Sequence, residues 1–89
     1  MSIEKHVDDW STALKRDIGD RRNHSASLQN MLAYVEMTPD LLAEIAMFNE
    51  AAAFADRMAP TEIDHMVDRL AEAAKRAGPN ATARAMLLD

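Results

Sequence analysis

The chain has 89 residues, enough for one small domain, with 48% hydrophobic but only 4% aromatic residues and a formal net charge of −5 at pH 7. Alanine is its commonest residue, and with two glycines, three prolines and few β-branched residues this composition predicts an all-α fold. The acidic balance argues against nonspecific nucleic-acid binding, which depends on Lys and Arg side chains that neutralise phosphates.

The first predicted helix begins after Ser2, whose side chain can cap it. Its apolar residues recur every three or four positions and form one face: Ile3, Val7, Trp10, Leu14 and Ile18. Gly19 is expected to end this helix in the left-handed conformation of a C-terminal cap. A polar loop at 20–27 then leads to a short second helix, which is predicted over 26–36.

The segment 39–59 is the stretch around which the fold is expected to be organised. Thr38, Pro39 and Asp40 give it a strong start signal, with an N-cap threonine, a proline at the first helical position and an acid in the first turn. On a helical wheel its apolar residues form two stripes. The first stripe consists of Leu41, Ile45, Phe48, Ala52, Ala55 and Ala59, and the second of Met47, Ala51, Phe54 and Met58. A helix apolar over more than half of its circumference belongs at the centre of a bundle or against another chain. We therefore expect a long, central third helix in an oligomer, with a homodimer favoured.

A fourth helix is predicted after Pro60, where Thr61 and Asp64 resemble a capping box. Its inward face consists of Ile63, Val67, Leu70, Ala74 and Ala77. The pair Gly78–Pro79 is expected to end this helix, since glycine is the usual C-terminal cap and proline cannot continue a helix.

The last segment is predicted to be a tail that Asn80 caps as a short helix. Its apolar positions are Ala81, Ala85 and Leu88. The predicted fold is therefore a small helical bundle of about four helices, because short connections favour antiparallel neighbours. Residues 1–79 are expected to form a single helical domain, and 80–89 a C-terminal tail.

Glu62 and His65 form an E-x-x-H pair, the spacing with which di-iron carboxylate bundles place a carboxylate and an imidazole on one helical face. The helical wheel places Glu62 about 100° from the inward stripe and His65 nearly opposite it. A metal site inside a bundle needs both side chains to point inward. We therefore predict a solvent-exposed pair, and no metal or other cofactor.

Glu44 lies between the two apolar stripes of the third helix. Its position one turn into the helix, where the macrodipole favours an anion, makes a solvated carboxylate the first interpretation. The alternatives are a carboxylate paired with an Arg or His across an interface, and a catalytic group.

Trp10, the one tryptophan, is interpreted first as a core residue and alternatively as a hot spot between helices. Methionine is flexible and suits a surface that accepts a partner's helix, so Met47 and Met58 favour an interface on the second stripe. The predicted interface consists of Trp10, Glu44, Met47, Ala51, Phe54 and Met58.

A cluster of basic residues is interrupted by acidic residues, and we interpret it as an ordinary charged part of the surface. It consists of Lys15, Arg16, Arg21 and Arg22.

The absence of cysteine excludes a disulfide, a thiol nucleophile and a thiolate metal site. The sequence begins without the apolar run of a signal peptide and has no apolar stretch long enough for a membrane span. We therefore expect a cytoplasmic protein that has no membrane partner.

The favoured function is that of a small acidic interaction module (an adaptor, regulatory subunit or inhibitor) that acts as a homo-oligomer or in a hetero-complex and is not an enzyme. The first alternative is a helix-turn-helix DNA-binding regulator, which the acidic starts of the third and fourth helices argue against. The second is a carboxylate and histidine metal site formed across a dimer from Glu44, Glu62, His65 or His24. No nucleophile–base pair, phosphate loop or repeated metal motif supports catalysis.

Overall fold

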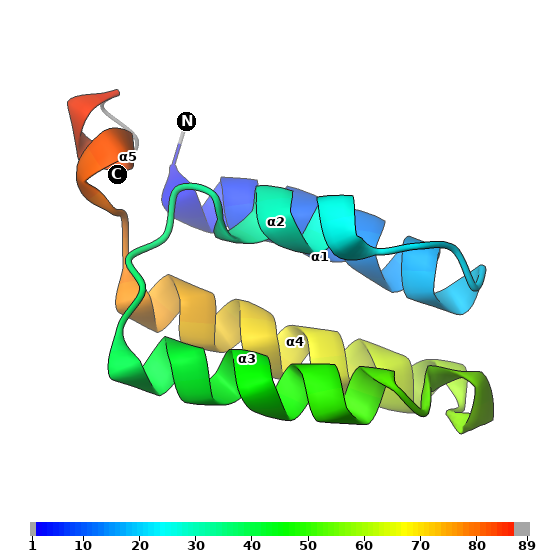
Figure 1. The fold of residues 1–89 in the computed structure, drawn as a ribbon. Coiled ribbons are helices and arrows are strands. Elements are labelled where there is room, and N and C mark those ends of the chain that lie inside the picture. Colours follow the sequence, from blue (N-terminus) through cyan, green and yellow to red (C-terminus); the bar gives the residue numbers. More distant parts are fainter. Residues whose placement is uncertain (1, 87–89) are drawn as a thin grey trace.

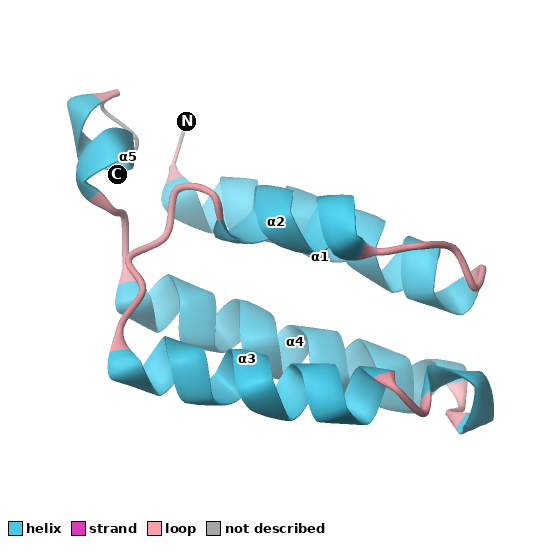
Figure 2. Cartoon of the chain, in the orientation of Figure 1, coloured by secondary structure: helices cyan, strands magenta, loops and turns pink. Residues whose placement is uncertain are grey.

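The computed structural model describes residues 2–86, and within this range the chain forms five α-helices and no strand. The helices are α1 (Ile3–Gly19), α2 (Ser25–Leu32), α3 (Pro39–Ala52), α4 (Pro60–Ala77) and α5 (Ala81–Ala85), and a 3₁₀ turn, η1 (Ala55–Arg57), precedes α4. Helix accounts for 76% of the described residues, which confirms the all-α prediction (Figure 2).

Helices α1 to α4 run alternately in opposite directions and lie in two layers, α1 beside α2 and α3 beside α4 (Figure 1). α4 contacts both α1 and α3, whereas the main contacts of α3 are with α4 alone. α4 buries six of its 18 residues, and α3 buries only Leu41 and Phe48 among its 14. The prediction of a long, central third helix is therefore wrong: α1 and α4 form the central pair, and α3 covers one side of α4.

α3 ends at Ala52, short of its predicted end. The backbone hydrogen bond that follows, from Phe54 N–H to the Ala51 carbonyl (3.0 Å), already has the tighter 3₁₀ spacing. α4 begins at Pro60 and returns antiparallel to α3 (Figure 1), so residues 53–59 must reverse the chain. A helix continued to the next proline would leave no residues for this reversal, and that is why the apolar periodicity overestimated its length.

α1 also ends differently from the prediction. It includes Gly19, and the left-handed conformation is adopted instead by Arg21, with φ 59°. Arg22 N–H donates to the Asp17 carbonyl (2.8 Å) and Arg21 N–H to the Ile18 carbonyl (3.1 Å), the hydrogen-bond pair of a Schellman motif. This later ending keeps Ile18 inside the helix, where its side chain is buried.

α2 ends at Leu32, before its predicted end, because the chain after it pairs with the segment that follows α4. Asn80 N–H donates to the Tyr34 carbonyl (3.0 Å), and Glu36 N–H donates to the Gly78 carbonyl (2.8 Å). We call this pairing the junction; it consists of residues 34–36 and 78–80. It ties the α2–α3 connection to the α4–α5 connection, which meet at one end of the molecule (Figure 1).

The start of the tail is held by the side chain of Asn80. Its Oδ1 accepts a hydrogen bond from Ala83 N–H (2.8 Å), which confirms the predicted cap, and its Nδ2 donates to the Ala33 carbonyl (3.0 Å). In α5, Ala83 is buried while Ala81 and Ala85 are exposed. Leu88 lies outside the described residues, and the boundary proposed at residue 79 stays a prediction.

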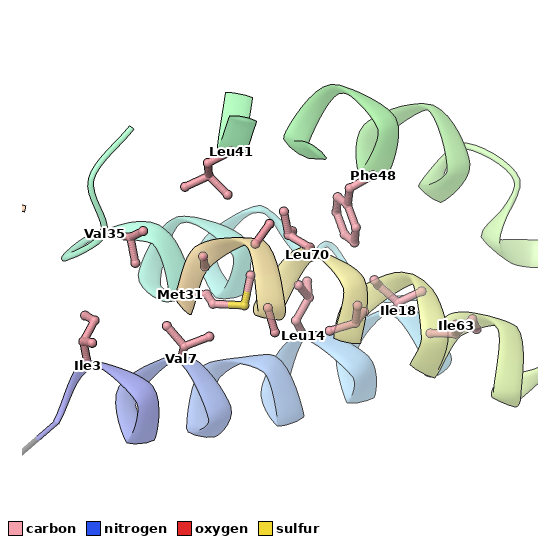
Figure 3. Close-up of a cluster of buried hydrophobic side chains, with 14 residues drawn as sticks. Ile3, Val7, Leu14, Ile18, Met31, Val35, Leu41, Phe48, Ile63 and Leu70 are labelled. Carbon is pink, nitrogen blue, oxygen red and sulfur yellow. The ribbon is translucent and has the colours of Figure 1, made fainter. Parts of the chain in front are cut away.

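The core lies between the two layers and receives the predicted inward faces of α1 and α4 (Figure 3). Its largest fully buried side chains are Val7, Leu14, Met31, Val35, Leu41, Val67 and Leu70. Phe48 points from α3 into this cluster (Figure 3). Trp10 and Ala77, which were also predicted to face inward, are half-buried and pack against the cluster.

Ion pairs connect the two long helices. Lys15 pairs with Asp68 (2.7 Å) and Lys75 with Asp8 (2.7 Å), each joining α1 to α4. The hydrogen bond to Asp8 raises the pKa of Lys75 above its ordinary value. Because these carboxylates are largely exposed, each pair contributes little to stability and serves mainly to fix the register of α1 against α4.

The N-caps predicted for α1 and α3 are both present. Ser2 Oγ accepts from Lys5 N–H (3.2 Å), and Thr38 Oγ1 accepts from Leu41 N–H (3.1 Å). The predicted cap at Thr61 is wrong, because α4 starts two residues earlier than a cap at Thr61 implies. Its N-cap is Ala59, whose N–H donates to the Glu62 carboxylate (3.0 Å).

This difference between the two threonines can be tested by alanine substitution. Thr38→Ala is expected to lower the free energy of unfolding by about 1 kcal/mol, since it leaves a helix N–H without its acceptor. Thr61→Ala is expected to change it by less than about 0.5 kcal/mol, because Thr61 is exposed and caps nothing. Urea denaturation of the two variants is the measurement. Equal losses would contradict the assignment of Thr38 as the cap.

Candidate protein-interaction surface

The side of α3 that points away from the core is unusually apolar. Leu42 and Met47 keep 53% and 46% of their surface exposed, and Phe54, just beyond the helix, keeps 59%. Glu50 and Asn49 are the polar residues between them. We call this surface the α3 face; it consists of Leu42, Ala43, Ala46, Met47, Asn49, Glu50, Ala53 and Phe54, all of them exposed.

The face follows from the composition of the segment. At about 100° per residue, only one side of α3 faces the core, and Leu41 and Phe48 lie at the centre of that side. Alanine has the highest helix propensity, so the alanines of this segment favour a helix whether or not their side chains are buried. The result is a helix with apolar residues on its solvent side as well, and such residues on a small domain mark an interaction surface.

A groove of about 180 Å³ runs beside the face, between α3 and α4. Its lining consists of Glu44, Met47, Phe48, Ala51, Met66, Arg69 and Leu70. Methionine side chains from both helices therefore border it, and their flexibility lets such a groove adapt to different apolar side chains.

Glu44 and Arg69 hold α3 and α4 together along this groove. Arg69 Nε and Nη2 donate to the two carboxylate oxygens of Glu44 at 2.8 and 3.2 Å, and Nη2 also lies 3.7 Å from Met47 Sδ. The hydrogen bond and the charge of Glu44 raise the pKa of Arg69. A second ion pair, Arg76 with Asp40 (3.2 Å), also joins the two helices, four residues before Glu44 on α3 and seven residues after Arg69 on α4.

The pairing of Glu44 with an arginine, which the sequence suggested across an interface, is thus made inside the chain. Only 14% of the Glu44 side chain is exposed, and both of its oxygens are engaged by Arg69. The geometry indicates that Glu44 fixes the position of α3 and so supports the groove.

The structure brings some of the predicted interface residues together and separates others. Glu44, Met47 and Ala51 line the groove, and Phe54 is the exposed residue that follows α3. Met58 leaves the predicted stripe because the helix has ended; it is half-buried and packs against the core. Trp10 packs against the core from α1. The interface role of all six residues stays a prediction.

Sequence reasoning missed Leu42, Met66 and Arg69. Leu42 belongs to neither of the two predicted stripes, although with Ala46 and Ala53 it recurs at helical spacing, a signal that is present in the sequence. Nothing in the spacing of the sequence could have shown that Met66 and Arg69 of α4 would lie beside α3, because that depends on the tertiary fold.

Glu62 and His65 are both exposed on α4. The Glu62 carboxylate accepts a hydrogen bond from Ala59 N–H and thereby caps the helix. Within residues 2–86, no group of three or more His, Asp and Glu side chains is placed to hold a metal ion. The geometry therefore assigns Glu62 a role in capping α4.

Among the described residues, no helix is both long enough and apolar enough to cross a membrane. In comparisons with known proteins, no family model matches the sequence, and neither a curated protein nor a solved structure matches it. The α3 face and the groove beside it are therefore the features from which a function can be argued.

Proposed function

We propose that this chain is a protein-interaction module that binds a partner protein through the α3 face. The observation that carries the proposal is the exposure of three large apolar side chains, Leu42 and Met47 on α3 and Phe54 just after it. Burying apolar surface contributes about 25 cal/mol per Å², so a partner that covers these side chains gains substantial free energy. Adaptors, regulatory subunits and inhibitors all act by such association, and the partner is either a second copy or another protein.

The small residues of the face support this proposal. Ala43, Ala46 and Ala53 have no side chain beyond Cβ, so the axis of a second helix can approach α3 closely. The large side chains at the two ends, Leu42 and Phe54, then act as the anchors. An apolar centre with anchoring side chains is the usual organisation of a helix-in-groove complex.

The first test is the mass of the complex that the chain forms in its native cells. The tagged chain is expected to elute in a species larger than one tagged chain (9.9 kDa plus the tag), and Leu42→Asp or Phe54→Asp is expected to return it to the mass of one tagged chain, since each places a charge in the apolar contact. Light scattering after gel filtration measures the mass.

Met86→Asp is the matched control for this test. Met86 is also an exposed large apolar residue (54%), but it lies after α5 and away from the α3 face. Its substitution is expected to leave the complex intact. If the tagged wild-type chain elutes at the mass of one tagged chain, or if all three variants behave alike, the α3 face is not the binding surface.

A further inference from the structure

The charges around the α3 face indicate what kind of partner fits it. Asp40 and Glu44, the acids at its start, are already paired with the α4 arginines Arg76 and Arg69. Glu50 lies on the face itself, between Met47 and Phe54, and is exposed. Among the ion pairs of the part of the chain that the structure describes, none involves Glu50. The face therefore carries one net negative charge amid apolar side chains.

A partner that covers the face must bring a group that compensates this carboxylate. Burying a charge without a partner is costly, whereas a cationic side chain opposite Glu50 would form a charge-assisted hydrogen bond in the contact. Glu62 adds to the negative field, because it lies one turn before the groove residue Met66 on α4 and is exposed. In the turn after Phe54, Asp56 and Arg57 are both exposed and their charges cancel, so this turn adds no net charge.

These charges argue against a second copy of the chain. If two α3 faces paired antiparallel about their midpoint near residue 48, the two Glu50 residues would be offset by only about 6 Å along the helix axes. In a parallel pair they would lie opposite each other. Like charges brought together in a largely apolar contact disfavour association, and each copy also carries a formal charge of −5.

We infer that the occupant of the α3 face is an amphipathic helix with cationic residues beside its apolar stripe. Its apolar side chains lie on Ala43, Ala46 and Ala53 and insert one anchor into the groove bordered by Met47 and Met66. Its Lys or Arg side chains lie at Glu50. α3 has 14 residues and is therefore about 21 Å long, which matches a partner helix of four turns. This inference rests on the proposed function and specifies the partner.

The test uses two synthetic helical peptides with the same leucine stripe, one with lysine and one with glutamate at its polar positions, each about 18 residues long so that it spans α3. Fluorescence anisotropy of the labelled peptides is expected to show binding of the lysine peptide at least tenfold tighter than that of the glutamate peptide. Glu50→Lys is expected to weaken the lysine peptide about tenfold and to strengthen the glutamate peptide, because it reverses the charge on the face.

Asp20→Lys is the matched control, since it changes the net charge equally but lies in the exposed loop after α1. It is expected to alter the affinity for either peptide less than twofold, and thermal melts of both variants verify that they remain folded. Equal effects of Glu50→Lys and Asp20→Lys would show nonspecific attraction to an acidic protein and would overturn the inference. So would equal binding of the two peptides.

Sedimentation equilibrium separates this inference from the proposed function on which it rests. A wild-type chain that forms a dimer abolished by Phe54→Asp, and that binds neither peptide, would overturn the cationic helix while supporting the α3 face as a binding surface. A wild-type chain that neither self-associates nor binds a peptide would count against both. A monomer that binds the lysine peptide through Glu50 supports both.

Discussion

Replacing Phe48 by alanine is expected to lower the free energy of unfolding by about 3–5 kcal/mol, the cost of a large cavity in a close-packed core. Phe48 is only 3% exposed, and its ring meets that of His24 edge to face with the centroids 6.1 Å apart. With Leu41 it is one of the two residues that α3 buries. Small domains have total stabilities of about 5–15 kcal/mol, so this single change removes much of what holds the molecule together. Urea denaturation followed by circular dichroism measures it.

Phe54→Ala is the matched control, because it makes the same change six residues later, on an exposed side chain just after α3. It is expected to alter the free energy of unfolding by less than about 0.5 kcal/mol. If Phe48→Ala fails to fold, Phe48→Leu is the milder variant, with an expected loss of about 1 kcal/mol. A large cost at Phe54 that grows with protein concentration would mean that a second chain covers it, contrary to the cationic-helix inference. Similar costs at both positions, independent of concentration, would contradict the arrangement of α3.

The second large effect is expected at Gly78, which has φ 79° and ψ −179°. This backbone region is accessible essentially to glycine alone, so Gly78→Ala is expected to destabilise the fold by about 1–3 kcal/mol. A Cβ at this position would meet no atom within 4 Å, so the cost arises from the backbone conformation and not from a clash. The carbonyl of Gly78 accepts a hydrogen bond from Glu36, and a change of its dihedral angles would also weaken the junction.

Gly19→Ala is the control for Gly78→Ala. Gly19 lies within the last turn of α1, has no positive φ and has open space at its Cβ position. Because alanine is a better helix former than glycine, this substitution is expected to stabilise the protein by up to about 1 kcal/mol. Urea denaturation midpoints that shift in opposite directions for the two variants are the expected result. A shift in the same direction would contradict the assignment of the left-handed position to Arg21 and of the strained position to Gly78.

Much of the fold could be predicted because it depends on short-range signals. The caps at Ser2, Thr38 and Asn80 are contacts between residues three positions apart, and the sequence alone places them. The inward faces of α1 and α4 were predicted by a single clean stripe each, since a helix with one apolar side has only one way to bury it.

The errors arise where distant segments meet. α2 ends early because Tyr34 and Glu36 pair with the chain near residue 79, and α3 ends early because 53–59 must reverse the chain toward α4. Neither constraint is visible in local periodicity, and alanine favours helix at both places. For the candidate surface, the excess of apolar residues in the third helix was visible in the sequence. The arginine that Glu44 binds was not, because Arg69 lies 25 positions further along the chain.

The junction brings together the two ends of the α3–α4 pair: the segment before α3 lies next to the segment after α4. Asn80 holds them together through its hydrogen bonds to the carbonyl groups of Ala33 and Tyr34. A binding partner therefore cannot displace the N-terminal end of α3 without first breaking the hydrogen bonds of the junction. At the C-terminal end of α3, Phe48 is buried in the core, and the connection to α4 is an irregular segment that makes no hydrogen bond to the junction. When a partner binds the α3 face, we therefore expect the end of α3 near Leu42 to resist displacement more than the end near Phe54.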